Sequence, residues 1–245
     1  MDDLSTPTLI ADTIVPVAAD APETGAPEAE VAKAADIGHH DLATQLVAKL
    51  CHDFISPAGA IMSGLDLLED PSAQDMKQEA LNLISTSAKK LITLVHFARV
   101  AFGAATTSEA FSGKELHKIL ADVYETMRAE LDFAIDPSEL FAKPAARALL
   151  NLGLLAGNAL PTGGKASLTC VRDETGLHLK SASRGPRARL KPEAIEGLSG
   201  LALSDGLSGQ WIQPHWLYSV VHEAGGTLAF DAQPDALDIT IDMPA

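Results

Sequence analysis

Cysteine, aromatic residues and positive charge are all scarce in this sequence. Two cysteines, Cys51 and Cys170, among 245 residues cannot form a disulfide framework or a cysteine cage, so no metal site is predicted. Aromatic residues make up only 4%, which leaves the packing to Leu, Ala, Val and Ile. Lys and Arg total 18 against 33 Asp and Glu, and the formal charge of −15 repels nucleic-acid phosphates and anionic membranes. Neither nucleic acid nor a membrane is therefore expected as a partner.

Targeting and membrane-spanning segments are also lacking. The chain opens with Met1-Asp2-Asp3 and has no basic region before an apolar stretch. The longest uncharged run, residues 148–164, contains Asn, Pro and several Gly, which makes it a poor bilayer span. These absences predict a cytoplasmic protein.

The composition is otherwise that of a soluble globular protein. Hydrophobic residues make up 47% and charged residues 21%, and the length allows one large or two modest domains.

Residues 1–38 differ from the rest, because they are rich in Ala, Pro, Asp and Glu and contain eight acidic residues against one Lys. They show no apolar periodicity, so we predict a disordered acidic tail.

Two long helical patterns follow the tail. Leu and Phe residues recur at helical spacing from His39 until Asp70-Pro71-Ser72 interrupts the pattern. A second run steps by four and three from Met76 to Ala101, as a heptad stripe does. Two such helices joined by a short turn form an antiparallel hairpin, and two helices alone cannot cover its apolar seam. Residues 39–105 therefore predict a helical hairpin that pairs into a dimeric four-helix bundle.

The remainder of the chain mixes helical and strand patterns. We expect a linker of polar and small residues over 103–112 and then helices near 113–128, 144–160 and 214–224, the last two with Pro in the first turn. Strands are indicated at residues 166–172, 177–183, 227–231 and 237–242. The predicted class is α+β, with a C-terminal α/β domain over residues 110–245 and a mostly antiparallel sheet.

His52 lies on the face of the first predicted helix that is opposite the apolar face, so it is not expected to pack in the core. On a helix that turns 100° per residue, His52 lies about 190° from the centre of the apolar face, so its imidazole is expected to point to solvent. Asp53 can accept a hydrogen bond from Nδ1–H, which leaves the Nε2 lone pair free as a nucleophile. Ser56 lies one turn on, either as a donor to a phosphoryl oxygen or as a plain surface residue. Pro57 kinks the helix and frees a backbone carbonyl. The candidate catalytic residues are His52, Asp53 and Ser56.

This order of residues resembles the phosphoacceptor box of two-component histidine kinases, and the hairpin resembles their dimerisation and phosphotransfer domain. From about residue 41 to the C-terminus, the sequence is similar to the ChpT family of dimeric histidine phosphotransferases from alphaproteobacterial phosphorelays. The motifs that support the resemblance are LCHDFISP at 50–57, SGLDLLEDPSAQDM at 63–76, RVAFGA at 99–104 and GPRARL at 185–190.

The resemblance implies a C-terminal domain like the ATP-binding domain of those kinases, but three of its nucleotide-binding features are missing. Leu155 stands where the kinases carry a magnesium-binding Asn, four residues after Asn151. Ser183-Arg184-Gly185 aligns with the adenine-binding Asp-x-Gly element. Gln210-Trp211-Ile212-Gln213 replaces the Gly-rich lid, whose glycines let the backbone approach phosphates. We expect no ATP and no other cofactor to be bound.

The resemblance also implies a function and partners. The chain would be a homodimer that takes a phosphoryl group onto His52 from the receiver domain of a CckA-like hybrid kinase and passes it to CtrA-like and CpdR-like response regulators. Mg²⁺ would come from the receiver. Two alternatives stay open: an active ATP-dependent histidine kinase, and a non-catalytic dimeric adaptor that only binds receivers.

Candidate receiver contacts lie beside His52, on the second helix, and in a basic cluster that could equally be a set of solvated loop cations. They are Ile55, Gly59, Met62, Ser63, Lys89, Arg99, Arg184, Arg187 and Arg189.

Overall fold

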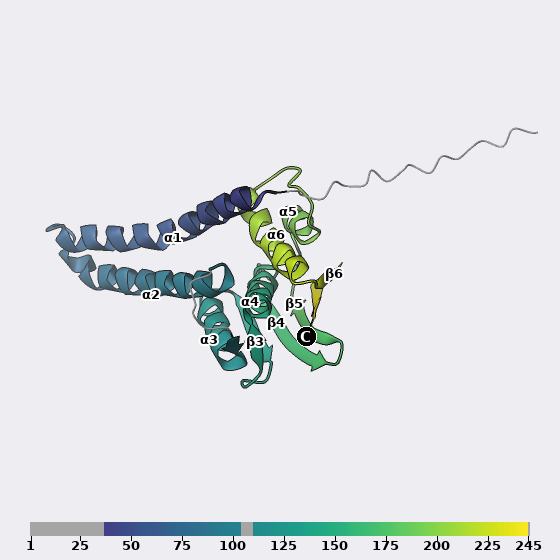
Figure 1. The fold of residues 1–245 in the computed structure, drawn as a ribbon. Helices are drawn as coiled ribbons and strands as arrows, with labels where there is room; N and C mark the ends of the chain where they lie inside the picture. The colour runs from purple at the N-terminus through teal and green to yellow at the C-terminus, as the bar shows by residue number, and fades with distance from the viewer. Residues whose placement is uncertain (1–36, 104–109, 245) are drawn as a thin grey trace, which may run out of the picture. The chain divides into compact units, whose positions relative to one another are not determined.

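The computed structural model describes residues 37–103 and 110–244 and shows an α+β fold (Figure 1). The predicted fold class is confirmed. Residues 1–36 of the predicted tail and 104–109 of the predicted linker lie outside the described residues. The elements are α1 (His39–Glu69), η1 (Gln74–Met76), α2 (Lys77–Ala101), β1 (Ala110–Ser112), α3 (Gly113–Tyr124), β2 (Ala129–Ala134), β3 (Leu140–Ala142), α4 (Lys143–Asn158), β4 (Gly164–Asp173), β5 (Gly176–Arg184), α5 (Pro192–Leu198), α6 (Ser208–Glu223), β6 (Thr227–Gln233) and β7 (Ala236–Met243).

Helices α1 and α2 form the predicted hairpin (Figure 1). Helix α1 ends at Asp70, whose carboxylate accepts hydrogen bonds from the backbone N–H and the hydroxyl of Ser72, both at 2.7 Å. The two helices approach closely at Gly64, where a Cβ atom would lie 2.6 Å from Cγ1 of Ile84. The missing side chain of Gly64 thus sets how near α2 can pack.

The C-terminal half contains a five-stranded sheet in the order β2-β4-β5-β7-β6. Strand β2 pairs with β4 in parallel, and the other three pairings are antiparallel, so the prediction of a mostly antiparallel sheet is confirmed. Side chains alternate in burial along β5 and β7, because only one face of the sheet is covered. Leu179 and Ile241 pair on the covered face, whereas Lys180 and Thr240 pair on the exposed face.

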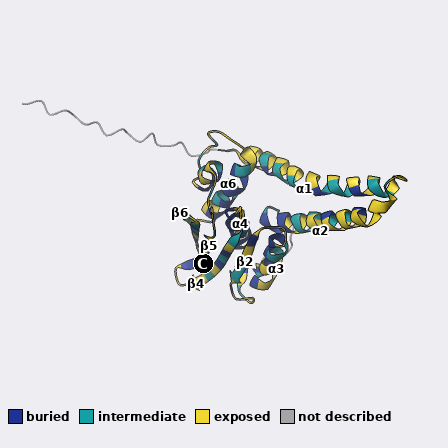
Figure 2. Cartoon of the chain, turned by 180° about the vertical axis from the view of Figure 1, so that it is seen from behind, coloured by how far each residue is buried: buried dark blue, intermediate teal, exposed yellow. Residues whose placement is uncertain are grey.

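The core lies under this sheet and reaches the base of the hairpin. Figure 2 shows the buried residues gathered in the α/β part and the exposed ones along the outer half of the hairpin. Phe97, Val100 and Ala101 at the end of α2 belong to the same core cluster as helix α4. A second, smaller cluster joins Leu42 and Leu46 of α1 to two residues of α6.

Several elements differ from the sequence-based expectation. Residues 110–112 of the expected linker form strand β1, which pairs with β3. Helix α6 begins at Ser208, so Pro214 lies inside this helix and not in its first turn. Strands β2 and β3 and helix α5 were not predicted, because β3 and α5 are short and burial does not alternate along β2.

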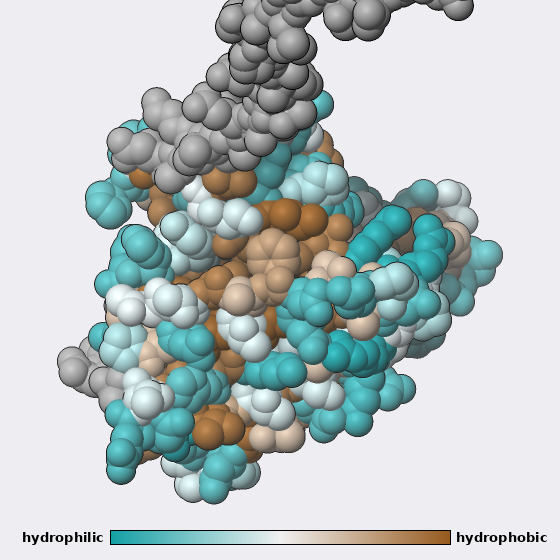
Figure 3. All heavy atoms as spheres, turned by 90° about the vertical axis from the view of Figure 1, so that its right-hand side faces the viewer, coloured by the Kyte–Doolittle hydropathy of each residue, from teal (hydrophilic) through white to brown (hydrophobic). Residues whose placement is uncertain are grey.

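The surface is polar over much of its area. A view of one face shows a hydrophobic area bordered by hydrophilic residues (Figure 3). Within residues 37–103 and 110–244, none of the helices has the length and apolar character needed to span a bilayer.

Candidate functional site

The imidazole of His52 points to solvent from the middle of helix α1. Its side chain is 87% exposed, which confirms the orientation predicted from the helical period. The opposite face of α1 is held in place from both sides, because Leu42 and Leu46 pack against α6 and Gly64 packs against α2. The result is a solvent-facing imidazole on a helix that is fixed by packing.

Asp53 is turned toward His52 but does not form the expected hydrogen bond. Its Oδ1 lies 3.5 Å from Nδ1 of His52, beyond the usual range of an N–H···O bond. The other carboxylate oxygen, Oδ2, accepts a hydrogen bond from Nζ of Lys49 at 2.6 Å. Lys49 therefore fixes the carboxylate that faces the imidazole. Sequence reasoning missed Lys49, although a Lys and an Asp four residues apart on a helix are the signal for such a pair.

Ser56 and Pro57 lie on the next turn of α1. Ser56 is exposed, on the side of the helix that carries His52. Pro57 is buried within the continuous helix, and its ring nitrogen has no hydrogen to donate to the carbonyl of Asp53. The prediction that this residue frees a backbone carbonyl agrees with its place inside the helix.

A cavity of about 440 Å³ opens beside His52, between α1 and the beginning of α6. Helix α1 contributes Gln45, Ala48, Lys49, His52 and Asp53, and the segment around the start of α6 contributes Leu207, Ser208, Gly209, Gln210 and Ile212. The first turn of α6 has no side-chain cap. The N–H group of Gln210 donates to the carbonyl oxygen of Leu207, and the aligned N–H groups of the first turn give this end of the helix a partial positive charge.

Asn151, Leu155 and Ser183, which the resemblance places at nucleotide-binding positions of histidine kinases, are buried side chains that pack in this fold. Asn151 is fully buried, and its Nδ2 donates to the carbonyl oxygens of Ala101 at 3.2 Å and Arg147 at 2.9 Å. Leu155 is buried in the core. Ser183 is also fully buried, and its hydroxyl donates to the carbonyl oxygen of Ala156 at 3.0 Å. These positions stabilise the fold of the domain.

The segment that would be a lid is helical. Gln210, Trp211, Ile212 and Gln213 form part of the first turns of α6, and the last three are buried. Trp211 donates its indole N–H to the carbonyl oxygen of Leu201 at 2.9 Å and packs with Ile212 against the start of α1. A segment packed in this way has no freedom to open and close over a nucleotide.

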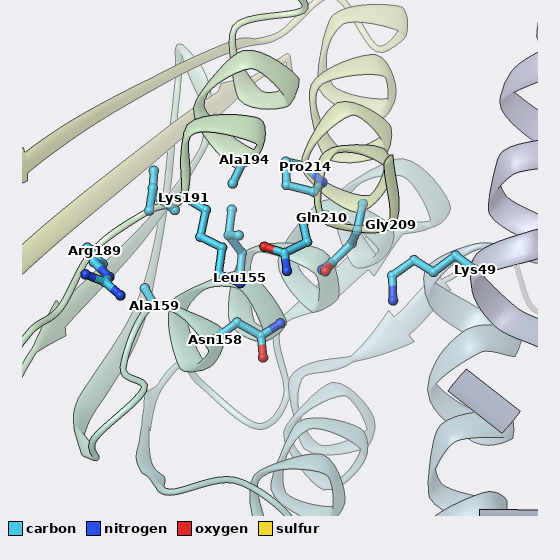
Figure 4. A pocket seen from close by; sticks show the side chains of 12 residues that line it. Lys49, Leu155, Asn158, Ala159, Arg189, Lys191, Ala194, Gly209, Gln210 and Pro214 are labelled. Atoms are coloured by element: carbon cyan, nitrogen blue, oxygen red, sulfur yellow. The ribbon is translucent and has the colours of Figure 1, made fainter. Parts of the chain in front are cut away.

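A second cavity of about 330 Å³ is lined by Leu155, Gln210 and Gln213, three of the residues at the expected nucleotide-binding positions (Figure 4). It shares Lys49, Gly209 and Gln210 with the cavity beside His52. Lys49, Arg189 and Lys191 are its charged lining residues, and no carboxylate is among the described residues that line it. In the described part of the chain, no group of three or more His, Cys, Asp or Glu side chains is placed to hold a metal ion. The lining thus offers neither the adenine-binding acid nor a carboxylate ligand for Mg²⁺.

The candidate receiver contacts are all exposed, but they do not form one patch. Ile55, Gly59, Met62 and Ser63 lie within about 80° of His52 around the axis of α1. Lys89 and Arg99 are exposed on α2.

The basic cluster lies in and after strand β5. Arg184 is paired within the chain, because its guanidinium lies 2.5 Å from the carboxylate of Asp238 and donates to two backbone carbonyls. Arg187 and Arg189 are exposed on the loop that follows. The cluster therefore offers a partner fewer free charges than its sequence suggested.

Known proteins resemble this chain in sequence and in structure. The family model for the histidine phosphotransferase C-terminal domain matches residues 113–236, just over half of the chain. The protein phosphotransferase ChpT of Brucella abortus (strain 2308) is 29% identical over 193 residues, which are 78% of this chain and 90% of the relative. A 1.7 Å structure of a bacterial phosphotransferase superposes with a TM-score of 0.76 and 26% identity, covering 85% of this chain and 98% of that one. The catalytic domain of histidine kinase ThkA also matches, with a TM-score of 0.42 and 17% identity, over 55% of this chain and 93% of that one.

Proposed function

The chain belongs to the histidine phosphotransferase family, and we propose that it carries the phosphoryl group on Nε2 of His52. The donor is the receiver domain of a CckA-like hybrid histidine kinase, and the acceptors are CtrA-like and CpdR-like response regulators. The observation that carries this proposal is the 87% exposed imidazole on a packed helix, with Asp53 turned toward Nδ1. Since receiver domains of this kind work in the cytoplasm, we also place the chain there.

The reaction is a reversible exchange of one bond to phosphorus for another. Nε2 of His52 attacks the phosphorus of the receiver's aspartyl phosphate, an N–P bond forms, and the P–O bond breaks to release the carboxylate. Both compounds are high-energy phosphoryl groups, so catalysis depends mainly on alignment and on stabilising the charge on the phosphoryl oxygens. We propose that Mg²⁺ is held by the receiver, because the carboxylate nearest to His52 is already engaged by Lys49.

The receiver is proposed to dock on the side of α1 that carries His52. Ile55 and Met62 are 70% and 57% exposed, which is unusual for large apolar side chains on a packed helix. Together with Gly59 and Ser63 they offer a flat, partly apolar surface beside the nucleophile. Lys89, Arg99, Arg187 and Arg189 would contact acidic groups of the receiver.

We also propose that two copies of the hairpin pair into a four-helix bundle. A second stripe of apolar side chains, Leu81, Ala88, Ile92 and Val95, follows heptad spacing on α2. Leu81, Ile92 and Val95 are among the exposed large hydrophobic residues, so this face of α2 is not covered by α1. Light scattering of the purified protein tests the pairing: the dimer mass is expected for the wild type, and Ile92→Glu should shift it toward the monomer.

One labelling experiment separates the proposal from both alternatives. The purified protein is incubated first with radiolabelled ATP alone and then with a receiver domain that carries labelled aspartyl phosphate. We expect no label from ATP and acid-labile label on His52 from the receiver. Label from ATP alone would identify an active kinase. An adaptor would take no label from either source, and His52→Ala would act as the wild type does.

A further inference from the structure

Lys49 lies three residues before His52 and is the least exposed charged group of the site. Its side chain extends from α1 toward Gly209 and Gln210 at the start of α6 (Figure 4). The side chain is 18% exposed, and its Nζ lies 2.6 Å from Oδ2 of Asp53, whose side chain is 32% exposed. Lys49 lines both cavities described above, so it lies between the His52 cavity and the second cavity.

The low exposure of Lys49 makes this pair different from an ordinary surface ion pair. Exposed Lys–Asp pairs four residues apart on a helix contribute little to stability, since water screens them and both side chains lose freedom. Lys118 and Asp122 on α3 form such a pair at 3.0 Å, with Lys118 76% exposed. The side chain of Lys49 is only 18% exposed, so separation from Asp53 would leave its charge with less water around it than that of Lys118. The position of the Asp53 carboxylate is therefore fixed.

We infer that Lys49 is a positioning residue for His52: it holds Asp53 so that one carboxylate oxygen is neutralised while the other faces Nδ1. This inference rests on the proposed function, in which Nε2 of His52 receives the phosphoryl group. An imidazole beside a carboxylate with no counter-charge favours the protonated form, which has no lone pair for the attack on phosphorus. Lys49 offsets that charge and leaves the orienting contact in place.

Lys49 and Asp53 are the titratable side chains that line the cavity with His52. The residues contributed by the α6 side, 207–210 and 212, are Leu, Ser, Gly, Gln and Ile, and none of them titrates between pH 6 and 9. The inference therefore predicts a pH-dependent defect when the charge of Lys49 is removed.

The test measures the rate at which His52 is labelled by potassium phosphoramidate, a donor that needs no receiver docking. Each variant is compared with the wild type at pH 6.5 and 8.5, so that the pH dependence of the donor cancels. Lys49→Met is expected to label about five-fold more slowly at pH 6.5 and within about two-fold of wild type at pH 8.5, because the uncompensated carboxylate favours the imidazolium at the lower pH. Lys49→Gln, which keeps a hydrogen-bond donor without the charge, should show the same pattern if the Met variant folds poorly.

The controls separate charge from structure. Lys49→Arg retains the charge and should label at the wild-type rate at both pH values. Lys118→Met breaks a Lys–Asp pair of the same spacing far from the site and should also match the wild type. An equal loss at both pH values, or no loss at either, would overturn the positioning role. Failure of the proposed function would give a different result, because His52→Ala would then take up as much label as the wild type.

Discussion

The carbonyl oxygen of Ala101, at the end of α2, accepts hydrogen bonds from Nε1 of Trp216 at 3.0 Å and from Nδ2 of Asn151 at 3.2 Å. Carbonyl groups in the last turn of a helix have no partner within the helix, and here α4 and α6 supply donors to one of them. The same contact ties the base of the hairpin to the α/β part. An Asn that resembles a nucleotide-site residue in sequence thus acts as a helix cap in the structure.

Replacing one of the two donors should therefore weaken the junction without breaking it. Trp216→Phe keeps an aromatic ring against Phe102 but removes the N–H, and we expect a loss of about 1 kcal/mol in the free energy of unfolding. Urea denaturation measures this loss. If the variant matched the wild type, the hydrogen bond of Trp216 would contribute nothing to stability, and Asn151 alone would satisfy the carbonyl.

His52→Ala should abolish phosphotransfer and leave the fold unchanged. The side chain is 87% exposed, and substitutions at such sites alter the free energy of unfolding by about 0.5 kcal/mol or less. Transfer from a phosphorylated receiver and thermal unfolding are measured on the same preparation. An inactive variant with a greatly lowered melting temperature would show that the histidine supports the fold, in contradiction to its exposure.

Asp53→Asn should slow the transfer without removing it. The substitution removes the carboxylate charge that lies 3.5 Å from Nδ1 of His52, and loss of a charge interaction of about 1 kcal/mol corresponds to a rate lower by about five-fold. Single-turnover transfer from a phosphorylated receiver measures the effect. Asp122→Asn is the matched control, because it breaks the Lys118 pair on α3 and should leave the rate unchanged.

Gly64→Ala should destabilise the hairpin, whereas Gly59→Ala on the same helix should not. A Cβ at residue 64 would meet Ile84 at 2.6 Å and the backbone oxygen of Ala80 at 3.1 Å, but a Cβ at residue 59 meets nothing within 4 Å. Overpacking of this kind costs about 1 to 2 kcal/mol, and Ala at an open helical site gains up to about 1 kcal/mol over Gly. Opposite shifts in melting temperature are expected, and an unchanged or raised melting temperature for Gly64→Ala would contradict the close approach of α1 and α2 at Gly64.

His178 should make the stability of the sheet depend on pH near neutrality. Its Nδ1 lies 2.6 Å from Asp242 and its Nε2 3.2 Å from Asp173, and these hydrogen bonds raise the pKa of His178 above 6.5, with Asp242 the larger cause. Hydrogen bonds, chiefly from the side chain of Thr175, lower the pKa of Asp173 to about 2, so this partner stays ionised. A raised native pKa means that the stabilisation is complete below the unfolded pKa of about 6.5 and is lost as the pH rises through the native value.

The comparison variant for this prediction is His178→Gln. The urea midpoint of the wild type should exceed that of the variant most at pH 5.5, and the difference should shrink by pH 8.5. A difference that stayed constant over this range would show that His178 acts through packing and not through its charge.

The helical period and local hydrogen-bonding residues made part of this molecule predictable. The apolar spacing of residues 39–101 specifies two helices and places His52 on the solvent side, because both depend only on neighbours within one turn. Ser112 and Glu115 likewise mark the start of α3, where each side chain bonds the backbone N–H of the other. These features are local, so the sequence alone indicates them.

Contacts between distant segments could not be predicted in the same way. The parallel pairing of β2 with β4 depends on α4 crossing between them, and β2 lacks the alternating pattern of a half-buried strand. The early start of α6 depends on the packing of Trp211 and Ile212 against Leu42 and Leu46, about 165 residues earlier in the chain.

The sequence by itself selected His52 as the proposed nucleophile and determined its outward direction, since a fixed rotation per residue orients each side chain on a helix. Only the tertiary structure decided the surroundings of that nucleophile. The start of α6 lines the same cavities as Lys49, whose side chain is only 18% exposed and pairs with Asp53 at 2.6 Å. The physical reason is that the exposure of a charged group to water depends on which distant segments lie near it. The spacing of residues along one helix does not specify those segments.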